Sequence, residues 1–403
     1  MTDTTPTALS DLRVLDLTDL KGALCAKLLG DMGADVIKIE PPGGDAMRTI
    51  GPFLDGTPHR DRSLLFWFYN TSKRGITLDI HQPAGREIFT QLAAQSDVVI
   101  ESFAPGTLAS LGLGYDELKR LNPKLVLTSI SPFGQTGPYR DYHSSDIIAE
   151  ALGGMIYTNG AADDPPLSAL GLQAYHSASF FAAIGTMSAL WARDTLDEGQ
   201  WVDISIQEAA TAAVEHVAPF YHQGMGVQTR QGSLHWSRYF RVARCRDGYV
   251  MHCTLGDWTS LVEWVKGDGK EQDLGEPQWE DQMYRRDHAE HLFEVLDEWA
   301  TDYSVAELME GAQLRRIPYA MVRPLEALAE DPQLNARGFF SPVEHPELGR
   351  TFRYPGGPFF FTATPWRISR RPPLLGEHNE EVYRQELGMS EQRVLELASA
   401  GVI

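Results

Sequence analysis

The first forty residues place short apolar runs on either side of a helical pattern. Residues 14–17 and 36–40 are mainly apolar, which is typical of strands buried on both faces of a parallel sheet. Between them, residues 23–29 are rich in good helix formers, and Gly33 stands where a helix often ends in a left-handed residue. A strand, a helix and a second strand over about thirty residues predict a βαβ unit.

The same alternation continues along the first half of the chain. A helix is predicted over residues 83–94 and a strand over 97–101, followed by a further helix and strand up to residue 131. Residues 176–199 carry small and apolar side chains nearly all round, which favours a helix buried between layers or between subunits. The pattern predicts an α/β fold, with a large Rossmann-like domain around a mostly parallel sheet.

The middle of the chain has a different pattern. Residues 240–253 read as a hairpin with Asp247 and Gly248 in its turn, and amphipathic helices follow around 258–266, 288–303 and 304–314. We therefore predict three segments. The first part of the large domain spans residues 1–225, a smaller α+β domain spans 226–325, and residues 326–403 return to the large domain.

Composition excludes several classes of partner. The net charge of −20 disfavours nucleic acid and anionic membranes, since both would be repelled. Cys25, Cys245 and Cys253 lack metal-ligand spacing and are expected to be buried, reduced thiols, with no metal site. The first residues are polar and no segment reaches the length of an apolar membrane span, so we expect a cytoplasmic protein.

Ligands of such a sheet bind beyond the carboxyl ends of its strands, here near residues 18–22 and 38–45. A dinucleotide is excluded at this place. The turn after the first strand reads TDLKG, with one glycine where the dinucleotide fingerprint needs three.

Eight motifs occur in a fixed order along the chain. They are LLGDMGADVIKIEPPGGD at 28–45, NTSKRGITLDI at 70–80, ESFAPGTLASLGLGYDEL at 101–118, SPFGQTGPY at 131–139, DEGQWVDISIQEA at 197–209, RDGYV at 246–250, DPQLNARGFF at 331–340 and LLGEHNEEV at 374–382. With these motifs the chain resembles the class III CoA-transferases, a family that includes formyl-CoA and carnitine CoA-transferases and the α-methylacyl-CoA racemases.

The resemblance implies a fold, a reaction and a set of contacts. It implies a large Rossmann-like domain built from both chain ends, and two chains interlocked like linked rings. In the family, an aspartate attacks the acyl-CoA carbonyl, and a mixed anhydride and then an enzyme-bound CoA thioester form before CoA passes to a carboxylate. Coenzyme A, as the acyl-CoA substrate, is the implied cofactor. The residues expected to contact it are Lys38, Lys73, Arg74, Phe103 and Gly106.

The chain departs from the family pattern at its nucleophile. The family's aspartate falls on Ala174 or Tyr175, and no Asp or Glu lies between Pro165 and Trp191. A tyrosine with an ordinary pKa near 10 is a poor substitute for a carboxylate. Ser102, Ala104 and Ser110 also stand where the family usually has Asn, Arg and Arg, and the last of these arginines grips CoA phosphates in the family.

Three other residues are weak candidates for catalysis. Asp146 and Glu150 match a family pattern near the active site, and His176 is next to the missing nucleophile and is a possible base, although a lone histidine is more often structural. A racemase needs a histidine directly before its aspartate, and here Ser145 precedes Asp146.

These observations favour one hypothesis over two alternatives. The first is the non-catalytic subunit of a succinyl-CoA-dependent, benzylsuccinate-type CoA-transferase of aromatic degradation, which pairs with a homologous subunit or with itself. The second is an active CoA-transferase that uses Asp146 or Glu150. The third is a 2-methylacyl-CoA racemase or a binding protein for CoA esters.

Overall fold

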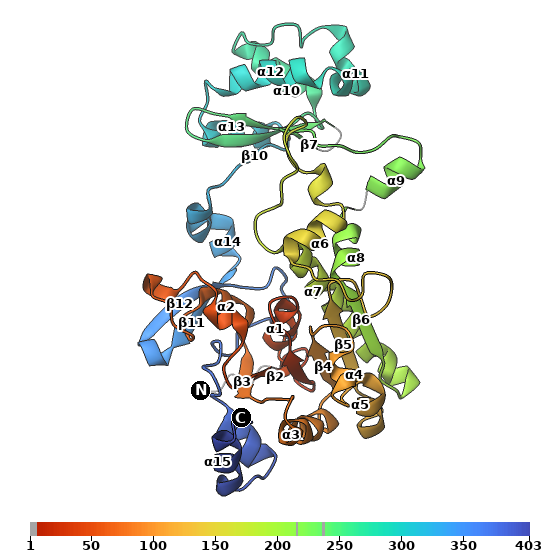
Figure 1. The fold of residues 1–403 in the computed structure, drawn as a ribbon. Helices are drawn as coiled ribbons and strands as arrows, with labels where there is room; N and C mark the ends of the chain where they lie inside the picture. The colour runs from red at the N-terminus through yellow and green to blue at the C-terminus, as the bar shows by residue number, and fades with distance from the viewer. Residues whose placement is uncertain (1–5, 215–216, 236–237) are drawn as a thin grey trace. The chain divides into compact units, whose positions relative to one another are not determined.

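The computed structural model describes residues 6–214, 217–235 and 238–403 (Figure 1). Its main feature is a sheet of six parallel strands in the order β3-β2-β1-β4-β5-β6. The strands are β1 (Arg13–Leu17), β2 (Asp35–Glu40), β3 (Lys73–Thr77), β4 (Val98–Glu101), β5 (Val126–Ser131) and β6 (Trp201–Ser205). The predicted parallel α/β sheet is confirmed.

The order of these strands determines where a ligand binds. The chain builds outward from β1 to β3 and then returns to add β4 on the other side of β1. The strand order thus reverses between β1 and β4, and doubly wound sheets usually bind ligands at the carboxyl ends of such a switch point.

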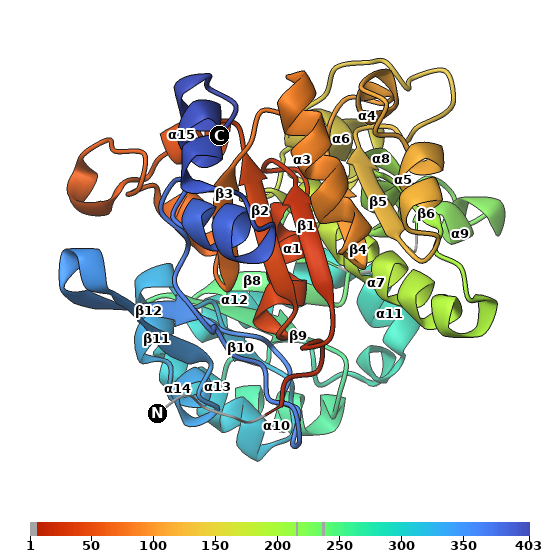
Figure 2. The same cartoon turned by 90° about the horizontal axis from the view of Figure 1, so that it is seen from below.

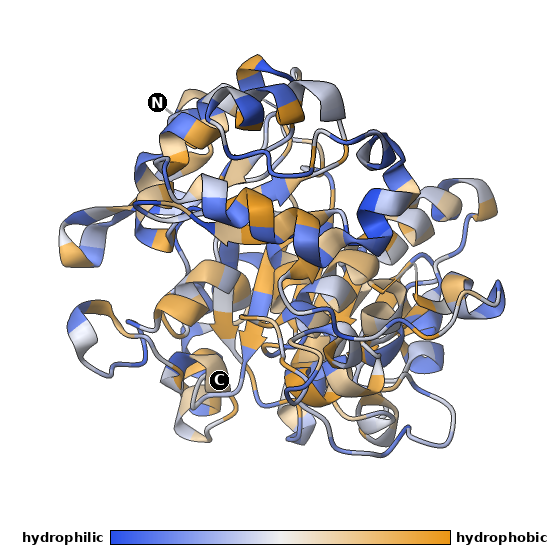
Figure 3. Ribbon diagram, turned by 90° about the horizontal axis from the view of Figure 1, so that it is seen from above, coloured by the Kyte–Doolittle hydropathy of each residue, from blue (hydrophilic) through white to orange (hydrophobic). Residues whose placement is uncertain are grey.

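Two layers of helices cover the sheet. Helices α1 (Ala23–Asp31) and α7 (Gln173–Leu196) contact one face, while α3 (Pro83–Ala94), α5 (Tyr115–Leu121) and α15 (Glu391–Ser399) cover the other (Figure 2). Successive strand residues alternate between the two apolar cores, because side chains of a strand point to opposite faces. The apolar colouring of the strands follows from this double burial (Figure 3).

Shorter elements complete this unit. They are α2 (Leu64–Tyr69), α4 (Thr107–Ser110), α6 (Asp146–Leu152), α8 (Ile206–Ala212), β11 (Phe340–His345) and β12 (Arg350–Pro355). Helix α14 (Pro332–Ala336) lies at the boundary where the chain returns to this unit, and only its last residue belongs to it. The end of the chain is joined to the sheet, since the Asp79 N–H donates to the Val402 carbonyl at 2.7 Å.

Residues 156–167 and 220–335 form a second compact unit with its own apolar core. Its antiparallel sheet has the order β10-β9-β8-β7. Its elements are α9 (Val217–His222, at its start), β7 (Leu234–His235), β8 (Phe240–Arg244), β9 (Tyr249–Cys253), α10 (Trp258–Gly267), α11 (Gln282–Asp287), α12 (Ala289–Ala300), α13 (Val305–Leu314) and β10 (Ala320–Met321). The hairpin between β8 and β9 turns at Asp247 and Gly248, as predicted.

The second unit is wider than the predicted range 226–325. It includes residues 156–167 because Arg230 donates to the carbonyl oxygens of Tyr157 and Ala161, and the Gly232 N–H donates to the Gly160 carbonyl. Such long-range backbone contacts leave no periodic signal in the sequence. Among the residues that the structure describes, every helix is too short or too polar to span a bilayer.

Candidate functional site

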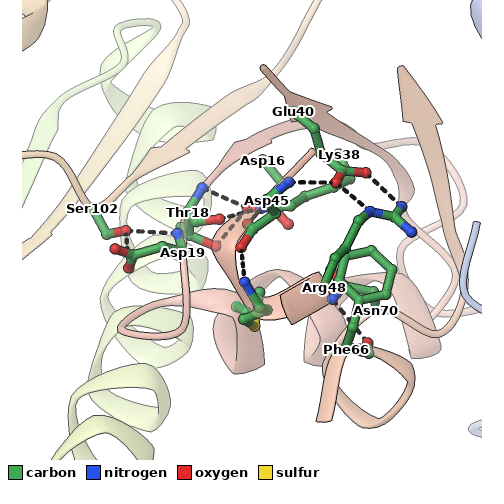
Figure 4. Close-up of polar contacts among 12 residues, drawn as sticks. Asp16, Thr18, Asp19, Lys38, Glu40, Asp45, Arg48, Phe66, Asn70 and Ser102 are labelled. Atoms are coloured by element: carbon green, nitrogen blue, oxygen red, sulfur yellow. Dashed lines mark hydrogen bonds and ion pairs between the residues drawn. The ribbon is translucent and has the colours of Figure 1, made fainter. Parts of the chain in front are cut away.

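The candidate site begins at the crevice between β1 and β4. The loop after β1 and the loop after β4 are tied together there by Asp19 and Ser102 (Figure 4). The Ser102 hydroxyl donates to the Asp19 carboxylate at 2.8 Å, and the Asp19 N–H donates back to the Ser102 oxygen at 2.9 Å. This reciprocal pair holds the two loops of the switch point in a single arrangement.

Phe103 and Gly106 lie on the loop that leaves β4. The Phe103 N–H donates to Glu101 at 2.7 Å, and burial raises the pKa of the Glu101 carboxyl to about 7. Gly106 has a φ of 83°, a left-handed conformation that glycine adopts without strain. Beside this loop is a cavity of about 170 Å³, whose lining includes Glu101, Gly106, Ser129, Gln135 and Trp201.

Lys38 and Lys73, which were expected to contact CoA, are buried in internal ion pairs. The Lys38 ammonium donates to the Thr18 carbonyl and lies 2.9 Å from Asp45 (Figure 4). Burial alone would lower the pKa of Lys38, but the neighbouring carboxylates outweigh it and raise that pKa. The Lys73 ammonium lies 2.7 Å from Asp16, to which it also donates a hydrogen bond.

Arg74, next to Lys73 on the edge strand β3, is also engaged in ion pairs. Its guanidinium pairs with Asp35 at 2.6 Å, with Glu381 at 2.7 Å and with Glu386. This geometry does not support the expectation that the three cations contact CoA. Their carboxylate partners come from distant parts of the chain, so the sequence pattern did not reveal them.

Ala174 and Tyr175, the residues expected at the family's nucleophile position, lie in the first turn of α7. Ala174 is fully buried, and Tyr175 is partly buried. The Tyr175 N–H donates to the Asp146 carboxylate at 2.8 Å, and the Ala174 N–H is directed at the same carboxylate. Asp146 thus satisfies N–H groups that a helix start leaves without intrahelical partners. Burial and the charges of Asp19 and Asp146 raise the pKa of the Tyr175 phenol to about 12.

Asp146 and Glu150 form a carboxyl pair one turn apart on α6. Burial and the Glu150 carboxylate raise the pKa of Asp146 to about 6. The Ser168 hydroxyl donates to Oε2 of Glu150 at 2.6 Å. Oε1 of Glu150 is buried and accepts no hydrogen bond from the described residues. Asp146 can therefore retain a proton at a higher pH than an ordinary aspartate.

His176 pairs with a tyrosine that the sequence pattern did not single out. The Tyr69 hydroxyl and Nε2 of His176 are 2.6 Å apart. Burial lowers the pKa of His176 and raises that of Tyr69 to about 12, so both groups are neutral at pH 7. Tyr69 is the last residue of the aromatic helix α2, and only its contact with His176 identifies it.

The structure thus brings Asp146, Glu150 and His176 together around Ala174 and Tyr175. Lys38, Lys73 and Arg74 instead form ion pairs with carboxylates of this chain. Within the described residues, no three His, Cys, Asp or Glu side chains form a group that could hold a metal ion.

The chain matches a family model and many known proteins. Residues 9–379 match the model of CoA-transferase family III. The chain is 35% identical to the succinyl-CoA:(R)-benzylsuccinate CoA-transferase subunit BbsE of Thauera aromatica, over 93% of either chain. It is 32% identical to the succinyl-CoA–L-malate CoA-transferase beta subunit of Chloroflexus aurantiacus, over 99% of both. A CAIB/BAIF family protein from Brucella suis has the same fold, with a TM-score of 0.84 and 27% identity over 94% of this chain and 99% of its own.

Proposed function

Because the chain belongs to CoA-transferase family III, we propose that it is the non-catalytic subunit of a heteromeric CoA-transferase. In this role it supports a homologous subunit that carries the nucleophilic aspartate. The proposed reaction moves CoA from succinyl-CoA to a carboxylic acid.

The observation that carries this proposal is the first turn of α7. A nucleophile must present an unprotected carboxylate to the thioester carbonyl. At this turn the chain has a methyl group at Ala174 and a phenol at Tyr175 whose pKa is raised to about 12. Asp146, the carboxylate next to this turn, already accepts hydrogen bonds from the N–H groups of the turn.

The relatives support the donor and the acceptor class. The two relatives above are named as succinyl-CoA-dependent transferases, and both are named as subunits. We infer succinyl-CoA as the donor and an aryl-substituted dicarboxylic acid of the benzylsuccinate type as the acceptor, since the benzylsuccinate enzyme subunit has the higher identity of the two.

An exposed apolar stripe supports association with a partner. Phe180, Ile184 and Trp191 lie along one side of α7, and Trp191 is 81% exposed. They line a groove of about 650 Å³ together with apolar residues of α1 and Phe359. Apolar surface of this kind on a soluble protein marks an interaction site. The proposed occupant is the homologous subunit or, in a homodimer, a second copy of this chain.

The test is activity with and without the partner. The full-length chain, tagged and expressed in its native host, is purified with whatever homologous subunit binds it, and also alone. We expect the complex, but not the single chain, to transfer CoA from succinyl-CoA to benzylsuccinate. Transferase activity of the single chain at the rate of the complex would refute the proposal.

A second candidate function is an active transferase with Glu150 as nucleophile. The observation that favours it is Oε1 of Glu150, which is buried and accepts no hydrogen bond from the described residues. Hydroxylamine trapping with succinyl-CoA, followed by mass spectrometry, separates the two functions. A hydroxamate on Glu150 and loss of activity in Glu150→Gln favour the second candidate, whereas an unmodified chain and an active Glu150→Gln complex favour the first.

A further inference from the structure

We propose that Arg140 binds a phosphate group of CoA at the Gly106 turn and replaces the arginine that this chain lacks. The inference rests on the proposed function, because it takes CoA as the ligand of the family fold. It adds a residue that neither the motifs nor the internal ion pairs identify. It also answers a physical difficulty, since a chain of net charge −20 needs a local cation to hold a polyanion.

The place of Arg140 is the first argument. Gly106 lies on the loop after β4, at the switch point where doubly wound sheets bind ligands. The Arg140 guanidinium lies against this glycine, and a Cβ added to Gly106 would come within 2.9 Å of Nη2 of Arg140. Because glycine has no Cβ, the guanidinium of Arg140 can lie directly against this turn.

The second argument is that the guanidinium has an unpaired donor. Nε of Arg140 is buried and has no hydrogen-bond partner in the described part of the chain. Nη1 of Arg140 lies 3.7 Å from the Asp141 carboxylate, and the Arg140 side chain remains 39% exposed. The guanidinium of Arg74, in contrast, makes three ion pairs. Arg140 offers a planar fork of donors, the geometry that phosphate oxygens match.

The third argument is the aromatic surface on the same turn. Tyr139 and Tyr142 flank Arg140 in the sequence, and their rings stack with centroids 5.0 Å apart. Both rings are exposed, by 42% and 59%, and Phe133 packs against each of them edge-on. An exposed ring beside a cation is a surface on which a purine base stacks. The geometry therefore points to the nucleotide end of CoA, with a phosphate on Arg140 and the adenine on a tyrosine.

The experiment measures binding of three ligands to the full-length chain by calorimetry. The ligands are CoA, dephospho-CoA, which lacks one phosphate, and pantetheine, which lacks the whole nucleotide. Four variants are compared with the unchanged chain. They are Arg140→Ala, Arg140→Lys, Tyr142→Ala and, as a matched control, Arg120→Ala, which removes a 72% exposed arginine of the neighbouring helix α5.

We expect Arg140→Ala to weaken CoA binding about 10- to 100-fold, which is the usual loss for one charge-assisted phosphate contact. Arg140→Lys should lose part of that affinity, because it retains the charge without the fork. Tyr142→Ala should lose about 5-fold or more, while Arg120→Ala and all affinities for pantetheine should not change. An equal loss for CoA and dephospho-CoA in Arg140→Ala assigns the contact to the diphosphate, and a loss for CoA alone assigns it to the other phosphate.

Two results would overturn the inference. One is an Arg140→Ala chain that binds CoA as tightly as the unchanged chain. The other is an unchanged chain that binds CoA no better than pantetheine. Neither result would refute the proposed function, which is tested by the transferase activity of the complex and of the single chain. Conversely, a complex without transferase activity would refute the proposed function but would not change the calorimetric result for Arg140.

Discussion

Lys73, the first residue of the edge strand β3, is buried and surrounded by acceptors. Its ammonium donates to Asp16 at 2.7 Å, to the Asn70 side chain at 3.0 Å and to the Ala23 carbonyl at 3.2 Å, and none of its surface is exposed. Burial by itself raises the pKa of Asp16, but the ammonium groups of Lys73 and Lys38 outweigh it and hold that pKa below its ordinary value. A buried pair of this kind is costly to break from one side, since the other charge remains in the core.

The substitution Lys73→Met tests this assignment. It should destabilise the protein by about 3–5 kcal/mol, because Asp16 is left buried without its counter-ion. Equilibrium unfolding in urea measures the loss. The control is Lys119→Met, which breaks an exposed pair with Glu198 and should leave stability nearly unchanged. If Lys73 instead gripped CoA, Lys73→Met would abolish CoA binding at unchanged stability.

Asp146 gives a second prediction, in pH dependence. Its pKa in the folded chain, about 6, lies above its ordinary value of 3.8 because of burial and Glu150. The folded state therefore holds a proton that the unfolded state releases between these values, so the stabilising contribution is present below pH 4 and is lost as pH rises through about 6. In Asp146→Asn the amide oxygen still accepts from the Tyr175 N–H, but the titration is removed.

The measurement is the free energy of unfolding of both chains from pH 4 to pH 7.5. The advantage of the unchanged chain over Asp146→Asn should decrease across pH 4 to 6 and stay level above pH 7. A constant difference at every pH would show that Asp146 has an ordinary pKa.

At the scale of the element, α7 has two different faces. Ala174, Ala178 and Ala182 are fully buried against the sheet and α1, where small side chains allow close packing. Ile184 and Trp191 on another face are 61% and 81% exposed. The sequence pattern, small or apolar nearly all round, predicted a helix between layers or subunits. In the described part of the chain, the face with Ile184 and Trp191 is left largely exposed.

Substitutions on the exposed face should therefore affect assembly rather than folding. We expect Ile184→Asp and Trp191→Asp to abolish co-purification of the partner subunit and to give a monomer by light scattering, with an unchanged unfolding midpoint. Asp194→Ala on the same helix is the matched control, since Asp194 is exposed and polar. Assembly that persists in both Asp variants would remove this face from the interface.

Elements with strong local signals were predictable in detail. The helix predicted at 83–94 is α3, Pro83–Ala94, because Pro83 is favourable at a helix start and an apolar stripe follows it.

At the scale of the whole molecule, local pattern accounts for the sheet but not for the site. Alternating strands and helices imply a parallel sheet, because each helix carries the chain back to the end of the sheet where the preceding strand began. The site is different, since Tyr69 meets His176, and Asp146 meets the start of α7, across long stretches of chain. The charged residues in the strands looked like ligand contacts because the sequence does not display their partners. Whether two chains interlock stays a prediction.

The two compact units have separate cores, and one buried histidine gives a means to test whether they unfold separately. His252 in β9 is fully buried and stacks on Tyr319, with ring centroids 4.7 Å apart, and neither ring nitrogen has a hydrogen-bond partner in the described part of the chain. Burial, helped by the charge of Arg241, lowers the pKa of His252 from 6.5 to about 3. Below pH 6.5, His252 therefore becomes protonated in the unfolded chain but stays neutral in the folded unit. As a result, the free energy of unfolding of this unit falls as pH decreases. At pH 5 the loss is about 2 kcal/mol.

We expect acid to open residues 220–335 before the parallel sheet, and we expect His252→Phe, which retains a ring for the stack on Tyr319, to delay that opening. Hydrogen exchange read by mass spectrometry between pH 7.5 and 4.5 follows each unit separately. In the unchanged chain, exchange in the antiparallel sheet should increase with acid while peptides from β1 to β6 stay protected. In His252→Phe, both sheets should stay protected to a similar pH. If acid opened both units at one pH in both chains, the units would form a single cooperative body and His252 would not control its acid stability.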